Sequence, residues 1–395
     1  MAALLLALLT RVTGTIPVNK GYGYDGEHYG RMIQIGFKLG TPSMRLRPVV
    51  LLINDEVNYH VFHDPLATFR AMNYVYAFAL GVILAGLCLH YGGTYLTAAT
   101  LIVNLFLSIA IAKMFAFYPA LVDLGAYAFL AAAVWAIVSG RRWLIVPATM
   151  LAVLSREFGA VTVLFGIVRD LRQRRPVAVV AATYAPAVAA FFWIRHVAAS
   201  YSTGAQVNEP VLSAVGVVAA LWTNLGMWLD PAYAALWIYF FITLFGGISL
   251  LLITAARPIA ARLREEPEWL AIIVPLLIVT ALGYADMWRY SAFLVAALPP
   301  LWVWAVSDVE PRRRWVLFAL VLLATLATQR PWQHMELRSY FTDWFPYYRF
   351  IENRPGAPSV LWPVWQYYAA IAAVSLTVIG TVRMRLAPKA AAGAA

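Results

Sequence analysis

The chain has 395 residues, of which 62% are hydrophobic, 14% aromatic and only 12% charged. A soluble domain is about half apolar and about a quarter charged, so this composition excludes a soluble globular enzyme, a disordered chain and a coiled coil. The formal net charge is +11, but the basic residues stand in short clusters beside apolar segments. This distribution is typical of membrane topology signals and not of a nucleic-acid partner. We therefore expect an all-α polytopic membrane protein.

Apolar segments that approach the length of a membrane span recur along the whole chain, so we expect one transmembrane domain over residues 1–395. A span needs about 20 mostly apolar residues, and about ten segments are predicted on this basis. They lie near 1–18, 70–90, 94–112, 119–139, 177–198, 231–255, 269–285, 290–306, 315–328 and 363–382. Arg11 and Thr13 interrupt the first segment. No small-residue cleavage site follows it, so we expect an anchor and not a signal peptide.

A further apolar stretch, 143–168, is broken at 155–157 by the tripeptide Ser-Arg-Glu. If this stretch crossed the membrane once, Arg142 and Arg169 would lie on opposite sides. If it is a hairpin of two short helices, every basic loop falls on the cytoplasmic side, as the positive-inside rule requires. These loops are 141–142, 169–175, 257–264, 312–314 and the tail from 383 to 389. We favour the hairpin, because broken helices are tolerated where protein covers the loose backbone.

This topology places two long loops outside the cell, 19–69 and 329–362, together with the tip of the hairpin and a short loop at 286–289. The second long loop is rich in aromatic residues. It has two interpretations, a cover that stacks on a sugar ring or an interfacial aromatic belt. The charged residues that need a functional explanation therefore gather on one side of the membrane.

The first outer loop contains the segment Gly-Tyr-Gly-Tyr-Asp-Gly-Glu-His-Tyr-Gly at 21–30, with two acids, Asp25 and Glu27, and a histidine, His28, between tyrosines. A carboxylate within hydrogen-bond reach of a reacting hydroxyl can act as a general base. The residues from His28 to Leu39 predict an imperfect amphipathic helix on the membrane surface. The alternative interpretation of the whole segment is a solvated loop followed by an interfacial helix.

Arginines near the ends of spans are candidates for binding a phosphate, because a guanidinium group is always charged and donates paired hydrogen bonds. Arg289, between Trp288 and Tyr290, is the best candidate, and Arg70 is a second one. An arginine beside aromatic residues is equally typical of the membrane interface. Arg156 has the alternative of an ion pair with its neighbour Glu157.

Metal and thiol chemistry receive little support from the sequence. His60 and His63 precede Asp64, but this spacing is loose for a metal site, and we predict no metal ligands. No cofactor is required. Cys88 is the single cysteine and lies in an apolar run, so we expect a core position and no intrachain disulfide.

The Tyr-Asp-Gly-(polar)-x-Tyr setting of Asp25 resembles the GT-C superfamily of integral-membrane glycosyltransferases, and most closely its bacterial multi-spanning members. Three shorter motifs are similar to theirs: Asp64 with Arg70 at the start of the second span, the Ser-Arg-Glu step at 155–157, and Trp-Arg-Tyr at 288–290 before Pro299-Pro300. The order of these motifs and of the predicted spans is similar to that of the family over most of the chain. It departs from the family pattern at Glu27, where glutamine is frequent, and at Asn73, where no second arginine follows Arg70 by one turn.

The resemblance implies a GT-C-like fold and transfer of a sugar from a polyprenyl-phosphate donor to a hydroxyl of a glycan, lipid or protein. It places the reaction on the extracytoplasmic face of a bacterial-type inner membrane. It implies that Asp25 is the general base of an inverting reaction and that Glu27 assists it. The residues expected to bind the donor phosphate or the substrate are Arg289, Arg70, Arg156, His28, Tyr29 and Asp64. Some members use a divalent cation, although nothing in this chain requires one.

Two other classes stay open. A transporter or flippase of lipid-linked glycans would place its charges near the middle of the bilayer, often in two related halves. Here the acids cluster in the first outer loop and no repeat is detected, which disfavours transport. A non-catalytic membrane scaffold would need no acid facing an arginine across a cavity.

Overall fold

The computed structural model of the chain describes residues 1–16, 18–37, 40–108, 111, 114–201, 222, 225–229, 244–282, 287–329 and 358–386. Within these ranges the regular structure is helical and no strand occurs. The helices are α1 Ala2–Thr13, α2 Tyr24–Ile35, α3 Pro42–Arg45, α4 Pro48–Val57, α5 Pro65–His90, α6 Tyr95–Leu107, α7 Met114–Phe117, α8 Asp123–Val138, α9 Arg142–Ser155, α10 Ala160–Arg172, α11 Val177–Ser200, α14 Gly247–Thr254, α15 Ala256–Glu265, α16 Leu270–Leu282, α17 Met287–Ser291, α18 Leu298–Ala305, α19 Arg314–Gln329 and α21 Pro358–Leu386, with short 3-10 turns η5 Glu157–Gly159, η9 Pro267–Trp269 and η11 Ala292–Ala297. The all-α prediction is therefore confirmed for the described residues.

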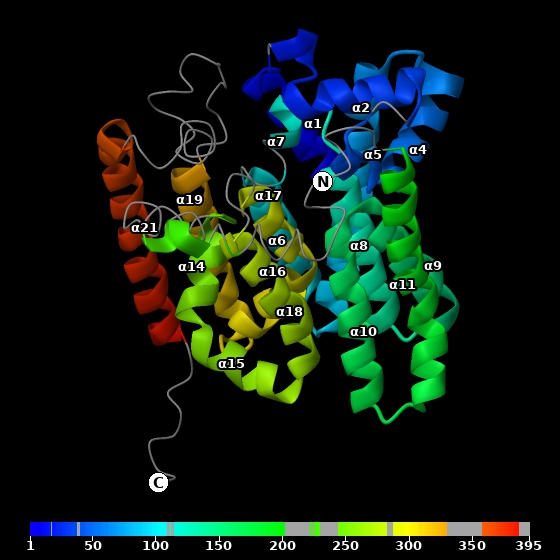
Figure 1. The fold of residues 1–395 in the computed structure, drawn as a ribbon. Coiled ribbons are helices and arrows are strands. Elements are labelled where there is room, and N and C mark those ends of the chain that lie inside the picture. The colour runs from blue at the N-terminus through cyan, green and yellow to red at the C-terminus, as the bar shows by residue number, and fades with distance from the viewer. Residues whose placement is uncertain are drawn as a thin grey trace.

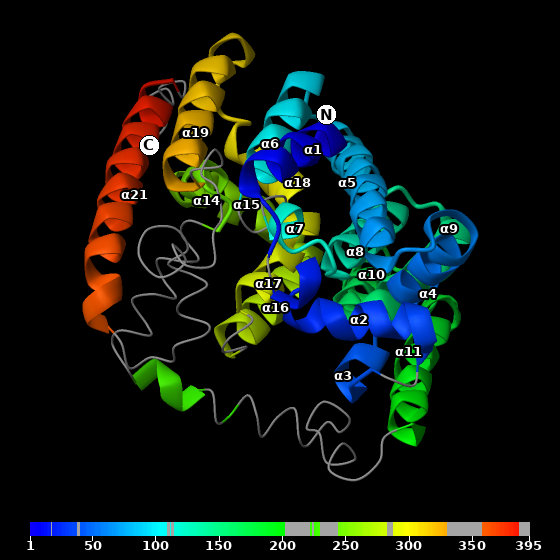
Figure 2. The ribbon, with the colours of Figure 1, turned by 90° about the horizontal axis from the view of Figure 1, so that it is seen from above.

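The helices form two neighbouring groups (Figure 1). One contains α5, α8, α9, α10 and α11, and the other contains α14 to α19 with α21 at its edge. Seen from above, α19 and α21 stay side by side, and α2, α3 and α4 lie across one end of the first group (Figure 2). Buried aliphatic and aromatic side chains from both groups form one continuous core.

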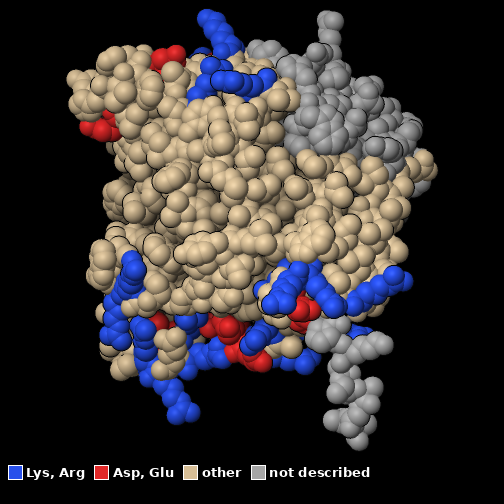
Figure 3. Space-filling view, turned by 180° about the vertical axis from the view of Figure 1, so that it is seen from behind, with Lys and Arg blue, Asp and Glu red and all other residues tan. Residues whose placement is uncertain are grey.

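Among the described residues, three helices are long and apolar enough to cross a membrane, namely α5, α11 and the part of α21 from Ala369 to Leu386. On the face that Figure 3 shows, the charged side chains of the described residues gather at the two ends and leave a broad uncharged band between them. A band of this kind is what a bilayer requires, because hydrocarbon cannot solvate charged groups. The chain is therefore a membrane-associated helical protein.

The other predicted spans coincide with shorter helices. The segment 94–112 contains α6, with 13 residues, and the segment 119–139 contains α8, with 16 residues. The segment 290–306 is divided among α17, η11 and α18. Ten full spans therefore stay a prediction. Parts of the segments 231–255 and 269–285, and residues 330–357 of the aromatic loop, lie outside the described residues.

The predicted break at 155–157 is confirmed. Helix α9 ends at Ser155, Arg156 has an extended backbone (φ −161°, ψ 145°), and α10 begins at Ala160. The chain turns so tightly that a Cβ added to Gly159 would lie 2.1 Å from the carbonyl oxygen of Ala152. Only glycine allows this close approach of two backbones. The break brings the Arg156 side chain into the interior, where the residue is 0% exposed.

The first outer loop is more helical than the sequence indicates. We predicted a helix from His28 to Leu39, but α2 begins at Tyr24 and ends at Ile35. Asp25 and Glu27 therefore lie in the first turn of a helix and not in the turn before it. An Asp-Gly pair is usually a turn signal, but here it lies within the first turn of α2, where Gly26 contacts Tyr118 and Ala120.

Candidate functional site

Asp25 and Arg289, both predicted as site residues, form an ion pair at one end of the first helix group. The Nη1 atom of Arg289 lies 2.9 Å from Oδ2 of Asp25. Its Nη2 and Nε atoms lie 2.8 and 3.1 Å from Oδ2 of Asp123, the first residue of α8. The side chain of Arg289 is 6% exposed and that of Asp25 is 38% exposed. The carboxylate is therefore held by a buried cation and stays open to the outside.

Asp123 also binds a second arginine. Its Oδ1 atom accepts a hydrogen bond from Nη1 of Arg156 at the helix break. The Nε atom of Arg156 lies 3.9 Å from Glu157, and Glu157 lies 3.5 Å from Nη2 of Arg47. The alternative pairing of Arg156 with its neighbour is thus the weaker of its two contacts. The carboxylate that holds Arg156 is Asp123, which is 33 residues away in the chain.

These contacts connect six side chains, which we call the charge network. Its members are Asp25, Asp123, Glu157, Arg47, Arg156 and Arg289. Three carboxylates face three guanidinium groups, so the formal charges cancel. Removing ions from water costs several kcal/mol each, and only good geometry and full pairing offset this cost. A largely buried network of this kind is therefore weak evidence for a stabilising role, and it marks a candidate site.

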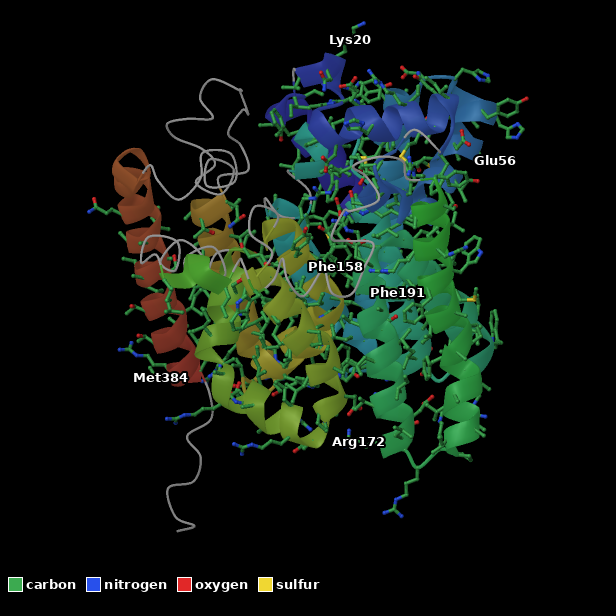
Figure 4. The ribbon with its side chains drawn as sticks, viewed as in Figure 1. Lys20, Glu56, Phe158, Arg172, Phe191 and Met384 are labelled. Atoms are coloured by element: carbon green, nitrogen blue, oxygen red, sulfur yellow. The ribbon has the colours of Figure 1, made fainter. Side chains whose placement is uncertain are left out.

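The pairing within the charge network is incomplete at Arg156. Its Nε and Nη2 atoms are buried, and they have no hydrogen-bond partner in the described part of the chain. The guanidinium carbon also lies 5.8 Å from the ring centres of Phe158 and Phe293. Figure 4 places Phe158 below α2 and far from Arg172 at the opposite end. Buried donors without partners are costly, and an anionic oxygen would satisfy them.

Tyr29 anchors the far side of the network. Its hydroxyl oxygen accepts a hydrogen bond from Nη1 of Arg47. The residue is 0% exposed, and this burial raises the pKa of the phenol. Tyr29 therefore stays protonated at neutral pH and orients Arg47 without adding a charge. Its role in binding the donor or the substrate stays a prediction, and the contact that the structure gives its hydroxyl is the one with Arg47.

A close contact between α2 and the segment before α8 positions Asp25. The backbone nitrogen of Gly26 donates a hydrogen bond of 3.1 Å to the hydroxyl of Tyr118. A Cβ added to Gly26 would lie 2.5 Å from Cβ of Ala120. The absence of a side chain at this position therefore allows the first turn of α2 to approach α8, where Asp123 begins the helix.

We expect Gly26→Ala to lower the free energy of unfolding by about 1–3 kcal/mol, because overpacking forces the two segments apart. Thermal unfolding in detergent measures this change. Gly226→Ala is the matched control, since no atom of the described residues lies within 4 Å of a Cβ added there. An unchanged melting temperature for Gly26→Ala would show that the two segments separate without cost.

The remaining predicted site residues lie outside the charge network. Glu27 forms an exposed ion pair of 2.6 Å with Arg31, one turn along α2, and His28 is exposed. Arg70 donates a hydrogen bond of 3.4 Å to Thr15. None of these contacts reaches Asp25. A role of Glu27 as helper to Asp25 therefore has no support from this arrangement.

Asp64 has a local structural role. Its Oδ1 atom accepts hydrogen bonds from the backbone nitrogens of Leu66, at 2.9 Å, and Ala67, at 3.4 Å. This is the geometry of a helix N-cap, and Pro65 occupies the first helical position of α5. The resemblance implies a substrate-binding role, whereas these bonds explain the aspartate by its position at the start of a helix.

We expect Asp64→Ala to cost about 1 kcal/mol of stability, the usual effect of losing an N-cap. Asp64→Ser keeps a capping oxygen, so its melting temperature is expected to lie close to that of the wild type. The activity of correctly folded protein is expected to stay the same in both variants. Loss of activity in Asp64→Ser, at wild-type stability, would instead assign the carboxylate to substrate binding.

Three members of the network were not among the predicted site residues, namely Asp123, Arg47 and Glu157, the last of which was considered only as an ion-pair partner of Arg156. Asp123 is an acid inside a predicted apolar span, and ionisable residues in such places are functional candidates by default. That signal was available in the sequence. Arg47 had no comparable signal, because it lies in a long loop with other basic residues.

No group of three or more histidine, cysteine or acidic side chains that could hold a metal ion occurs among the described residues. His60 forms a hydrogen bond of 2.8 Å with Glu56. Cys88 is buried, as expected. Comparison of the chain with protein-family models, curated proteins and solved structures finds no match.

Proposed function

We propose that the protein is an integral-membrane glycosyltransferase that moves a sugar from a polyprenyl-phosphate donor to an acceptor hydroxyl. The observation that carries the proposal is the carboxylate of Asp25, open on one side and paired on the other with the buried Arg289. A general base needs both properties, a fixed orientation and access to the reacting proton. Glycan, lipid and protein hydroxyls are all acceptors compatible with this arrangement.

The reaction is a single displacement at the anomeric carbon. The acceptor oxygen forms a bond to that carbon while the bond from the carbon to the phosphate oxygen breaks. The hydroxyl proton passes to Asp25, and the bonding electrons leave with the polyprenyl phosphate. Attack on the face opposite the leaving group inverts the anomeric configuration. Arg289 keeps Asp25 in place during this step and does not itself touch the phosphate.

Arg156 is the better candidate for binding the donor phosphate. Arg289 uses Nε, Nη1 and Nη2 to bind carboxylates, whereas Nε and Nη2 of Arg156 are buried without hydrogen-bond partners among the described residues. A phosphate oxygen would accept charge-assisted hydrogen bonds from these two N–H groups. We therefore assign the phosphate to Arg156 and the positioning of Asp25 to Arg289.

The positive-inside rule orients the site in this proposal. The basic loop 169–175 belongs to the end of the molecule that carries Arg172, opposite α2 (Figure 4). If that end faces the cytoplasm, the open carboxylate of Asp25 faces the extracytoplasmic side. The expected location is the inner membrane of a bacterial cell, where polyprenyl-phosphate sugars are presented on that side.

The proposal is tested by transfer of radiolabelled sugar in proteoliposomes that contain the purified protein. The panel contains polyprenyl-phosphate sugars as donors, nucleotide sugars as negative controls, and envelope lipids and glycans as acceptors. Transfer from at least one polyprenyl-phosphate sugar, with none from nucleotide sugars, supports the proposal. Transfer from nucleotide sugars alone would contradict the donor class.

A flippase of lipid-linked glycans is the second candidate. It is favoured by two interrupted segments, α9 with α10 and α17 with α18, which contribute arginines to a buried network. Interrupted helices of this kind frame the binding sites of many transporters. Movement of a fluorescent lipid-linked sugar across liposomes, without covalent transfer, would favour this candidate over the transferase.

A further inference from the structure

A polar cavity of about 640 Å³ lies at the end of the molecule away from the charge network. The last turns of α5, α10, α15 and α18 surround it. Arg172 belongs to its lining and lies at the lower end in Figure 4. The lining combines arginines, acids and aromatic residues, among them Arg169, Arg172, Glu266, Glu268 and Trp304.

A second cavity of about 310 Å³, which we call the apolar groove, lies between α14, α15, α16 and α18. Its lining is aliphatic and aromatic apart from Ser249. Ile253 at its rim is 41% exposed. In a membrane, a groove of this composition is filled by hydrocarbon, because water finds no polar partners there.

The two cavities follow each other along the same helices. On α18, Leu298 and Leu301 line the groove, and Trp304, one turn further, lines the polar cavity. On the opposite wall, Ile273 of α16 lines the groove, and Glu268, just before that helix, lines the polar cavity. Both walls therefore change from apolar to charged in the direction of the charged end of the molecule. This order matches the acyl chain and headgroup of a phospholipid.

The charges of the polar cavity are of both signs. Glu268 is buried and binds Arg169 at 3.1 Å and also Arg172. This shared carboxylate fixes two guanidinium groups at the wall of the cavity, where their remaining N–H groups suit a phosphate. Glu266 lines the same cavity, and within the described ranges its carboxylate makes no ion pair. A ligand that carries a phosphate and an ammonium group complements both features.

We propose that this site binds a phospholipid with a phosphoethanolamine headgroup. The phosphate lies against Arg169 and Arg172, the primary ammonium donates hydrogen bonds to Glu266, and one acyl chain occupies the apolar groove. Phosphatidylglycerol offers no cation to Glu266. Phosphatidylcholine offers a cation without N–H donors, so it forms no charge-assisted hydrogen bond there. The site does not depend on the proposed transferase reaction.

Native mass spectrometry of the delipidated full-length protein tests the proposal. Phosphatidylethanolamine, phosphatidylcholine and phosphatidylglycerol with identical acyl chains are added at equal concentrations. We expect about tenfold tighter binding of phosphatidylethanolamine than of either other lipid, the effect of one charge-assisted hydrogen bond. Glu266→Gln is expected to remove this preference, whereas Glu266→Asp retains part of it. Glu310→Gln, an exposed acid paired with Arg313 outside the cavity, is the matched control.

The groove is tested separately with Leu277→Trp, which fills it and is expected to weaken binding of all three lipids. Equal binding of the three lipids by the wild type would overturn the proposal, and so would retention of the preference in Glu266→Gln. A preference for phosphatidylglycerol would show a site for anionic lipid instead. If Glu266→Gln fails to fold, the ranking of the three lipids by the wild type still decides.

Discussion

Asp25→Asn is expected to lower the rate of sugar transfer by about 10²–10⁴-fold, the usual contribution of a general base. The amide keeps the shape of the side chain and can still accept a hydrogen bond from Arg289, but it cannot take the acceptor's proton. Initial rates are measured in proteoliposomes at matched protein amounts. The effect is expected on kcat, with little change in KM for the donor, because the base acts in the transition state.

Glu27→Gln provides the matched control for this experiment. Glu27 lies on the same turn of α2, but its carboxylate is paired with Arg31 at the surface, so its loss is expected to leave transfer within about twofold of the wild type, as for other exposed ion pairs. Equal losses in both variants would show that the first turn of α2 matters for structure only. Transfer that is indifferent to Asp25 would keep the enzyme class and remove the proposed base.

Asp123→Asn is expected to produce the largest loss of stability, about 3–5 kcal/mol, because it leaves two buried guanidinium groups without their shared counter-charge. Asp123 is 0% exposed and contacts Arg156 and Arg289 at once. Thermal unfolding in detergent reports the loss. Transfer is expected to fall as well, since Arg289 holds Asp25.

A double variant tests whether Asp123→Asn loses stability because it leaves a buried positive charge unbalanced. Asp123→Asn combined with Arg156→Gln removes one buried charge of each sign and leaves Arg289 paired with Asp25. We expect this protein to be more stable than Asp123→Asn alone, a non-additivity typical of directly contacting residues. If the free energy of unfolding of the double variant falls by the sum of the two single losses, the two residues act independently, contrary to the hydrogen bond between them.

The sequence predicted those elements that are determined by their own stretch of residues. Helices α5 and α11 are continuous apolar segments of membrane length, and the break between α9 and α10 follows from charged residues that a lipid-facing helix does not tolerate. The motif around Asp25 predicted a candidate site, and the structure pairs Asp25 with Arg289, a second residue of that prediction. Each of these features is encoded in one continuous stretch of the sequence.

The features that the sequence did not predict depend on contacts between distant segments. The start of α2 at Tyr24 depends on the fit of Gly26 against Tyr118 and Ala120. The binding of two arginines by Asp123 depends on the break after α9 and on the position of α17. The pattern of apolar residues around Asp123 does not indicate which arginines of distant segments will pair with it.

The order of the charge network along the chain has a consequence for biosynthesis. Asp123 and Arg156 are 33 residues apart and enter the membrane in succession, so their pairing is available early. Asp25 and Arg289 are 264 residues apart, so the ion pair between them can form only after most of the chain has been synthesised. The open carboxylate thus acquires its fixed orientation only at a late stage of membrane insertion. A chain truncated before α17 would carry every acid of the network and lack the cation that joins Asp25 to Asp123, so the ion pair of Asp25 cannot form in such a fragment.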